Sequence, residues 1–262
     1  MRVAELQIAP WEKILLAECQ PDNLAVYDDV IVKTDQGLDL AKVLDVYETK
    51  EALAMETEII RRATGEDYRG LLSEGDKSNA FQVCYELIKR LDLGMKLVDV
   101  RGSFDGSRLT FAFVANGRVD FRELVKELTH HFNKSIRLQQ IGIRDEARAT
   151  GDQGRCGRGL CCKNSLTKFS SVTSEVAEVQ NLSGRGSDRL SGACGRLMCC
   201  LAYEAEGYKD LAAKLPAVGE AITIGGKRGL VSGQNLLKQS LQVRFKGDKG
   251  EADYTLEVDW KK

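Results

Sequence analysis

One motif, Cys-Gly-Arg-x-x-Cys-Cys, occurs twice in this chain and constrains its folding more than any other feature. The first copy spans residues 156–162 and the second spans residues 194–200, so each matched position is offset by 38 residues. The glycine two positions before the first cysteine repeats as well, at Gly154 and Gly192. Three cysteines, two glycines and an arginine do not recur in one register by chance. The two copies are therefore a repeated unit.

The residue types of this repeat predict a metal centre. Thiolates are soft ligands that select zinc, copper(I) or iron–sulfur clusters. We expect Gly157 and Gly195 to let the backbone turn tightly and to aim amide hydrogens at sulfur. We expect Arg158 and Arg196 to place positive charge beside the thiolates, which favours the deprotonated ligand. The predicted ligands are the six cysteines of the repeat: Cys156, Cys161, Cys162, Cys194, Cys199 and Cys200.

The spacing of the cysteines alone leaves the metal open. Structural zinc sites usually show paired cysteines two to four residues apart, or two cysteines with two histidines. Neither pattern is present, and the two histidines, His130 and His131, fall in a predicted helix. A Cys-x₄-Cys element is part of the spacing in plant-type ferredoxins, although an adjacent Cys-Cys pair is not. An iron–sulfur cluster and zinc therefore both stay as candidates at this point.

Two interpretations without a metal also remain. In the first, the adjacent cysteines of each pair form a redox-labile disulfide, which the reducing cytosol opposes. In the second, all six cysteines are buried thiols that act as small hydrophobic residues. The remaining two cysteines have no predicted site: Cys84 lies on the apolar face of a predicted helix, and Cys19 follows an apolar run that predicts a strand.

Composition argues against a largely disordered chain, a chain that is basic overall, and a secreted or membrane-inserted protein. Hydrophobic residues make up 43% and charged residues 29%, which is an ordinary globular balance. Thirty-eight basic residues face thirty-nine acidic ones, so no whole-molecule field attracts nucleic acid or anionic membrane. The first residues carry Glu5, Glu12 and Glu18 without a long apolar stretch, and they do not predict a signal peptide. We expect a cytoplasmic protein that does not insert into a membrane and whose thiols stay reduced.

The hydrophobic pattern predicts an α+β protein in four segments. Residues 1–64 predict a β-rich segment, with strands flanking a turn at Gly37. Residues 65–143 predict an α-β-β-α-β unit with helices packed on a sheet. Residues 144–215 predict a cysteine-rich metal-binding region whose apolar content is too low for a conventional core. Residues 216–262 predict a small antiparallel β-barrel, with turns at Gly225-Gly226 and at residues 247–250.

The α-β-β-α-β unit gives the clearest pattern. Asp76 is predicted to cap a helix that runs to Leu93 and stops at Gly94. Two strands follow this helix, and Asp105-Gly106 between them predicts a hairpin turn. Asp120 and Glu123 have the spacing of a capping box for the second helix, and Ile136, Leu138 and Ile141 predict a third strand.

A local basic strip predicts a weaker, second function. Residues 144–200 hold nine Lys or Arg against six Asp or Glu, and Phe169 is the lone aromatic residue between Arg144 and Cys200. Basic side chains contact phosphates, but aromatic side chains that stack on bases are scarce here. No nucleophile–base motif or phosphate-binding loop appears, so the sequence does not predict an enzyme. The nucleic-acid candidates are Arg155, Lys163, Arg185 and Arg189.

Several stretches resemble one bacterial protein family. Residues 95–100, 116–125 and 140–147 are similar to characteristic stretches of the YaaT/RicT family, which has a C-terminal domain of the polymerase-suppressor (PSP) type. Both cysteine motifs match that family in order and spacing. The resemblance covers about residues 25–260.

The resemblance implies a non-enzymatic regulator that carries 4Fe–4S clusters. It implies that the six motif cysteines supply cluster ligands, which moves the expected cofactor toward iron–sulfur, with zinc as the alternative. It implies assembly with two small helical proteins of the YlbF/YmcA type. It also implies action on the membrane-anchored endonuclease RNase Y in messenger-RNA maturation, with effects on sporulation, competence and biofilm formation.

Overall fold

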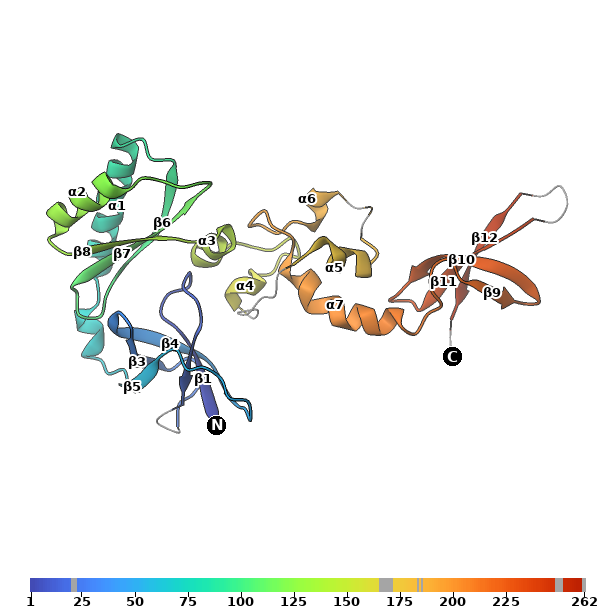
Figure 1. The fold of residues 1–262 in the computed structure, drawn as a ribbon, viewed down its shortest axis with the longest axis horizontal. Helices are drawn as coiled ribbons and strands as arrows, with labels where there is room; N and C mark the ends of the chain where they lie inside the picture. The colour runs from blue at the N-terminus through green and yellow to red at the C-terminus, as the bar shows by residue number, and fades with distance from the viewer. Residues whose placement is uncertain (20–22, 165–171, 183, 185, 248–251, 261–262) are drawn as a thin grey trace. The chain divides into compact units, whose positions relative to one another are not determined.

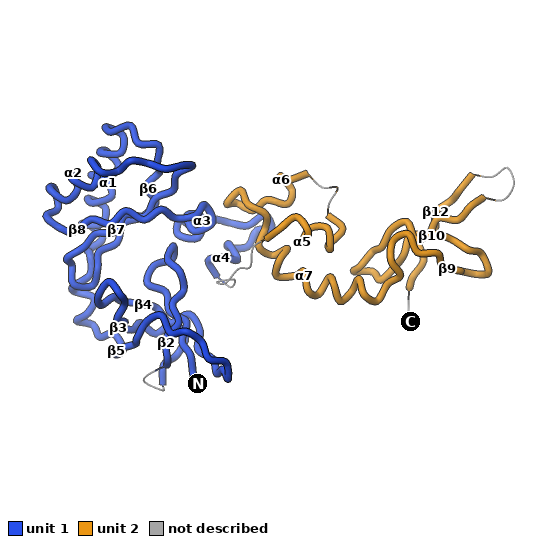
Figure 2. Tube along the Cα trace, in the orientation of Figure 1, with its two compact units in different colours: residues 1–167 blue, residues 168–262 orange. Residues whose placement is uncertain are grey.

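The computed structural model describes residues 1–19, 23–164, 172–182, 184, 186–247 and 252–260. Contacts along the chain divide it into two compact units, Met1–Thr167 and Lys168–Lys262 (Figure 2). Each unit is built from both helices and strands, which confirms the predicted α+β class (Figure 1). Within the described ranges, no helix has both the length and the apolar character needed to cross a membrane.

The first unit begins with a five-stranded antiparallel sheet, as the β-rich pattern of residues 1–64 predicted. Its hydrogen-bonded order is β2-β1-β4-β3-β5. Gly37 takes a φ of 112° between β3 and β4, so the predicted turn at this glycine is confirmed. The strands are β1 (Arg2–Gln7), β2 (Leu15–Glu18), β3 (Asp29–Thr34), β4 (Gly37–Glu48) and β5 (Glu58–Arg62).

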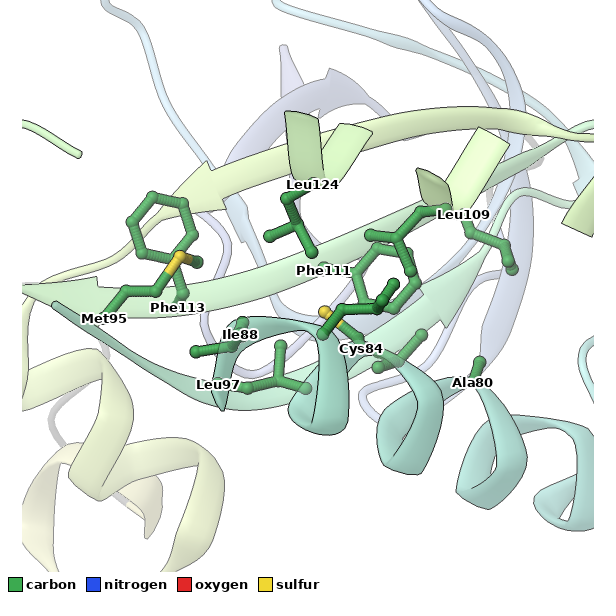
Figure 3. Close-up of a cluster of buried hydrophobic side chains, with 12 residues drawn as sticks. Ala80, Cys84, Ile88, Met95, Leu97, Leu109, Phe111, Phe113 and Leu124 are labelled. Carbon is green, nitrogen blue, oxygen red and sulfur yellow. The ribbon is translucent and has the colours of Figure 1, made fainter. Parts of the chain in front are cut away.

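The central part of this unit has the predicted α-β-β-α-β order. The strands β6 and β7 pair antiparallel, and β8 lies parallel to β7. Both helices pack on one face of this three-stranded sheet, where Cys84, Phe111 and Leu124 are fully buried (Figure 3). Cys84 is therefore a core residue, as predicted. A short 3-10 helix, η1 (Asp67–Gly70), precedes the elements α1 (Glu74–Arg90), β6 (Met95–Gly102), β7 (Arg108–Ala115), α2 (Arg122–Phe132) and β8 (Ser135–Gln140).

The predicted helix caps were wrong in detail. Ser73, and not Asp76, caps α1: its hydroxyl accepts a hydrogen bond from the Asp76 N–H at 3.1 Å. The helix ends at Arg90, three residues before the predicted end. Asp120 does not make the predicted capping box with Glu123: α2 begins at Arg122 after Phe121, and the Asp120 carboxylate accepts from both the backbone N–H and the guanidinium of Arg122. A polar residue near a helix start has several possible partners, and spacing does not choose among them.

The reverse face of the central sheet is covered by the loop between β1 and β2. Trp11, which is 3% exposed, packs there against Ala112 and Ile141. Its indole Nε1–H donates to Asp99 Oδ2 at 2.8 Å. Helix α3 (Ile143–Thr150) adds Ala149 to this cluster, and the four-residue α4 (Cys161–Asn164) follows within the described part of the unit.

The second unit combines helices with an antiparallel sheet in the order β12-β11-β10-β9. The predicted strands are present, and Gly225 and Gly226 form the predicted turn with positive φ values. A closed barrel is not shown, because β9 and β12 are the two ends of this sheet in the described residues. The second predicted turn, at residues 247–250, lies largely outside them. The elements are α5 (Ser174–Val179), α6 (Ser187–Leu190), α7 (Cys199–Ala212), β9 (Ala221–Ile224), β10 (Lys227–Asn235), β11 (Ser240–Phe245) and β12 (Tyr254–Asp259).

Candidate metal centre

The first cysteine motif forms a tight loop in the first unit. Gln153 and Gly159 pair as an isolated antiparallel bridge, which closes the loop at its base. Inside it, the Gly154 N–H donates to Arg158 O at 2.8 Å, and the Gly157 N–H donates to Gly154 O at 2.9 Å. The chain then enters α4 directly at Cys161.

The second motif forms the same loop in the second unit. Ser191 and Leu197 make the corresponding bridge, 38 residues further along. The Gly192 N–H donates to Arg196 O at 2.8 Å, and the Gly195 N–H donates to Gly192 O at 2.9 Å. Helix α7 begins at Cys199, the counterpart of Cys161. The sequence repeat is therefore also a structural repeat, since the same backbone hydrogen bonds recur at matched positions.

The glycine after the first cysteine of each motif has a left-handed backbone. Gly157 has a φ of 77° and Gly195 a φ of 75°. Residues with a Cβ rarely adopt this backbone conformation, so glycine suits both positions. The tight turn expected at these glycines is present in both loops. Their effect on a bound metal stays a prediction.

A second pair of glycines lies close to the thiols, and no role for it was expected from the sequence. A Cβ built on Gly154 would lie 3.5 Å from the Cys156 Sγ, and one on Gly192 would lie 3.9 Å from the Cys194 Sγ. Both glycines also donate the hydrogen bond that closes the loop around the first cysteine. The signal that points to them is their recurrence in both copies of the motif.

The paired cysteines of each motif differ in direction because they start a helix. Successive helical residues point about 100° apart, so two adjacent thiols do not face one ligand in the same way. In the first motif Cys162 is buried whereas Cys161 is partly exposed and Cys156 is exposed. In the second motif Cys194, Cys199 and Cys200 are all partly exposed. Partial exposure leaves most of these thiols accessible to a metal ion.

The second loop is supported by a buried hydrogen bond from outside the motif. Gln180, which is buried, donates through Nε2 to Leu201 O at 2.6 Å. Leu201 lies in the first turn of α7, directly after the cysteine pair, and is itself buried. This bond joins the end of α5 to the start of α7 and fixes the helix that carries Cys199 and Cys200.

The basic candidates lie on the surface around the two loops. Arg155, Arg158 and Lys163 are exposed near the first loop, and Arg189 and Arg196 are exposed near the second. Arg158 and Arg196 also serve the loops through their carbonyl oxygens, which accept the closing hydrogen bonds. Arg185 lies outside the described residues.

The donor chemistry of the six cysteines fits a thiolate-bound metal or cluster. Among the described residues, however, no group of three or more His, Cys, Asp or Glu side chains is arranged to hold a metal ion. Each motif places its own three cysteines on one short loop and helix start. The residues of the sequence-predicted site are thus ordered within each loop, and their joint use as ligands stays a prediction.

A polar cleft in the first unit was missed by sequence reasoning. Arg101 on β6 binds Asp39 on β4 in a bidentate pair, with N–O distances of 2.7 and 2.8 Å. Glu12 lies 4.0 Å from the same guanidinium. These side chains line a cleft of about 720 Å³. Burial raises the pKa of the Asp39 carboxyl to about 6, with Glu12 adding to the rise and Arg101 opposing it.

Family models match two separate parts of the chain. The model described as the PSP1 C-terminal conserved region matches residues 57–141, which include β5 and the whole α-β-β-α-β unit. The model described as the third domain of PSP1-like proteins matches residues 171–215, which include the second cysteine loop and α7.

Two proteins of known sequence are similar to the chain. The Stage 0 sporulation protein YaaT of Bacillus subtilis is 41% identical over 235 residues, which cover 87% of this chain and 84% of that protein. An uncharacterized protein of Schizosaccharomyces pombe is 26% identical over 137 residues, covering 40% of this chain and 18% of that protein. No solved structure matches the chain. The extent and identity of the Bacillus match, together with the PSP1 regions, show that this chain belongs to the YaaT/PSP1 family.

Proposed function

We propose that this chain is a non-catalytic regulatory subunit that carries a 4Fe–4S cluster and acts through partner proteins. The observation that carries the proposal is the structural repeat, in which two loops with the same backbone hydrogen bonds present three cysteines each. A developmental role is supported by the similar Bacillus protein, which is named as a stage 0 sporulation protein.

The cysteines supply the chemistry that a cluster needs. Thiolates are the usual ligands of iron–sulfur clusters. Gly157 and Gly195 shape the turn after the first thiol, and the N–H groups of Gly154 and Gly192 close the loop around it. Helix α7 adds the partial positive charge of its N-terminus next to Cys199 and Cys200, which favours thiolate there. When bound, a cluster would supply a group that responds to oxygen and to electron transfer.

The proposed partners are two small helical proteins of the YlbF/YmcA type and, through them, RNase Y. In this proposal the complex promotes messenger-RNA maturation and thereby affects sporulation, competence and biofilm formation. The chain itself binds protein surfaces, and any RNA contact is indirect. We expect the chain to form a stable complex with purified partners of this type under anaerobic conditions, as measured by size-exclusion chromatography with light scattering.

A pair of matched variants tests the assigned ligands. Cys194→Ser removes a proposed ligand, whereas Ser191→Ala changes a nearby side chain of the same loop that is no ligand. We expect anaerobically purified Cys194→Ser protein to lose most of the visible absorption of an iron–sulfur cluster and Ser191→Ala to keep it. Equal spectra for Cys194→Ser and the unchanged protein would remove Cys194 from the ligand set.

A zinc-stabilised module that binds RNA is the second candidate. The exposed basic residues around both loops, Arg155, Lys163, Arg189 and Arg196, favour it. It predicts binding of single-stranded RNA that weakens steeply as salt is raised. The triple charge reversal Arg155→Glu, Arg158→Glu and Arg196→Glu should abolish such binding, and RNA affinity unaffected by these changes would reject this surface.

A further inference from the structure

Three arginines lie on one face of the central sheet, one from each strand. Arg101 of β6 and Arg137 of β8 both lie opposite Thr110 of β7. Arg108 lies two residues before Thr110 on β7, so it points to the same face of the sheet. The helices α1 and α2 pack on the other face. The three guanidinium groups instead reach β4 and the turn that precedes it.

Two of these arginines converge on one neutral residue. Arg108 Nη1 donates to the Gln36 carbonyl oxygen at 3.4 Å, and Arg137 Nη1 donates to Gln36 Oε1. Gln36 lies in the turn between β3 and β4 and brings no charge. Among the described residues, neither guanidinium group forms an ion pair. The Nε of Arg108 is also buried there without a hydrogen-bond partner. Two like charges therefore meet at a neutral amide.

The carboxylates at the other end of the cleft are engaged elsewhere. Asp39 pairs with Arg101 through both carboxylate oxygens, and Glu12 lies 4.0 Å from the same guanidinium. On the rim, Glu56 pairs with Lys13 at 2.6 Å. The part of the cleft around Arg101 therefore has one more negative than positive charge.

The part of the cleft around Gln36 has the opposite balance. Arg108 and Arg137 meet there, and the remaining charged side chain is that of Asp35, an exposed residue of the same turn. Two positive charges against one leave an excess of positive charge at this end. The cleft is thus polarised, basic around Gln36 and acidic around Glu12.

We propose that this cleft binds a small phosphate monoester whose remaining part is a neutral polyol, such as a sugar phosphate. Arg108 and Arg137 hold the phosphate in place of Gln36, because guanidinium groups bind phosphate oxygens through paired N–H groups. The Glu12 carboxylate accepts hydrogen bonds from ligand hydroxyl groups and repels a second anionic group. The cleft volume of about 720 Å³ lies in the range of small-molecule sites and leaves room beyond the phosphate.

Two neighbouring substitutions in the turn test the site with opposite changes of charge. Gln36→Glu places a carboxylate between the two guanidinium groups, in competition with phosphate, so we expect the Kd for ribose 5-phosphate to rise about tenfold. Asp35→Asn removes a negative charge beside them, so we expect this Kd to fall about two- to threefold. Isothermal titration calorimetry of the full chain at about pH 8, where the monoester is a dianion, measures both.

Arg137→Gln and Lys13→Gln are a matched pair that each lose one positive charge. Arg137→Gln removes a proposed phosphate contact and should raise the Kd about tenfold. Lys13 is 72% exposed on the rim, so Lys13→Gln should change the Kd by less than about threefold at physiological salt. Gln36→Glu should keep the melting temperature of the unchanged protein, because its carboxylate can pair with both arginines. Its weaker binding is then not a loss of fold.

Inorganic phosphate and a single-stranded RNA oligomer separate the other possibilities. Ribose 5-phosphate should bind more tightly than inorganic phosphate, since its hydroxyl groups use the rest of the cleft. Equal affinities for the two, or binding of the RNA without binding of ribose 5-phosphate, would overturn the sugar-phosphate assignment. No binding of ribose 5-phosphate up to about 10 mM, or an unchanged Kd in both Gln36→Glu and Arg137→Gln, would overturn the site itself.

Discussion

Gly157 and Gly195 are the residues on which the shape of the two cysteine loops depends. Their φ values of 77° and 75° lie where an L side chain costs about 1–2 kcal/mol. The space around both positions is open, since a built Cβ meets no atom within 4 Å. A substitution there is therefore a test of backbone conformation and not of packing.

We predict that Gly157→Ala and Gly195→Ala each destabilise their loop by about 1–2 kcal/mol. Gly207 is a matched control, because it lies inside α7 with open space around it. Gly207→Ala should instead raise the free energy of unfolding by about 1 kcal/mol, as alanine favours a helix interior. Hydrogen exchange of the loop amides measures the difference, and equal protection in Gly195→Ala and Gly207→Ala would contradict the assignment.

Asp39 and Glu12 both lie near the guanidinium of Arg101. Burial of the Asp39 carboxyl is the largest cause of its raised pKa of about 6. The ordinary value for this group is 3.8. The folded chain therefore holds the proton more tightly than the unfolded chain does. The protonated Asp39 carboxyl therefore stabilises the folded chain fully below about pH 3.8, and this stabilisation is lost as the pH rises through about 6.

We predict that Asp39→Asn removes this part of the pH dependence. Between pH 4 and pH 7 the unchanged protein should lose about 2 kcal/mol relative to the variant, which is most of the about 3 kcal/mol that a shift of about two pKa units represents. Denaturant unfolding at several pH values measures it, with Asp45→Asn, an exposed carboxyl of the same strand, as control. Parallel stability curves for Asp39→Asn and the unchanged protein would contradict the assigned pKa.

At the scale of the elements, periodic segments were predicted well and their ends were not. The apolar faces of α1 and α2 and the strands around Asp105-Gly106 were predicted because each repeats its pattern over several residues. The start of α1 depends on Ser73, whose hydroxyl accepts from the Asp76 N–H and donates to the Asp76 carboxylate. Two polar residues take part in this one cap, and local spacing does not show which of them precedes the helix.

Sheet order lay beyond the sequence pattern as well. The β-rich segment was predicted, but its pattern does not indicate that β4 separates β1 from β3. The pattern of the α-β-β-α-β unit likewise does not indicate that β8 runs parallel to β7. The predicted barrel depended on closure between end strands, which short strands with regular turns do not specify. The described residues form an open sheet there.

The core between α1, α2 and the central sheet should dominate the stability of that part of the chain. Phe111 is fully buried there, in contact with Phe132, with ring centroids 6.5 Å apart. We predict that Phe111→Ala costs about 3–5 kcal/mol in free energy of unfolding. Tyr85→Ala, which truncates an aromatic side chain that is 39% exposed on α1, should cost less than about 1 kcal/mol. Denaturant unfolding measures both, and equal losses would show that Phe111 is not central to this core.

At the scale of the whole molecule, the sequence predicted which cysteines form the candidate site. It did not predict the residues that support or surround that site. The motif names all six cysteines because cysteine is rare and the repeat is in register. The support from Gln180 was missed, since a glutamine outside the motif carries no signal of its own. The pair of Asp39 and Arg101 was missed because 62 residues separate its members along the chain.

We predict that the metal stabilises the cysteine region more than the rest of the chain. A structural metal contributes on the order of 10 kcal/mol to a small site. Removing it with a chelator, or substituting Cys156→Ser and Cys194→Ser together, should make residues 144–215 sensitive to limited proteolysis. The α-β-β-α-β unit, with its own buried core, should stay resistant. Unchanged cleavage of residues 144–215 after both treatments would show that no metal organises them.

The most direct measurement is the iron, acid-labile sulfide and zinc content of protein purified under strict anaerobiosis, together with its absorption spectrum. If the duplicated cysteine loops hold a 4Fe–4S cluster, the protein is brown and contains iron and sulfide in equal amounts, near four of each per cluster. Colourless protein with stoichiometric zinc and no sulfide would contradict that assignment.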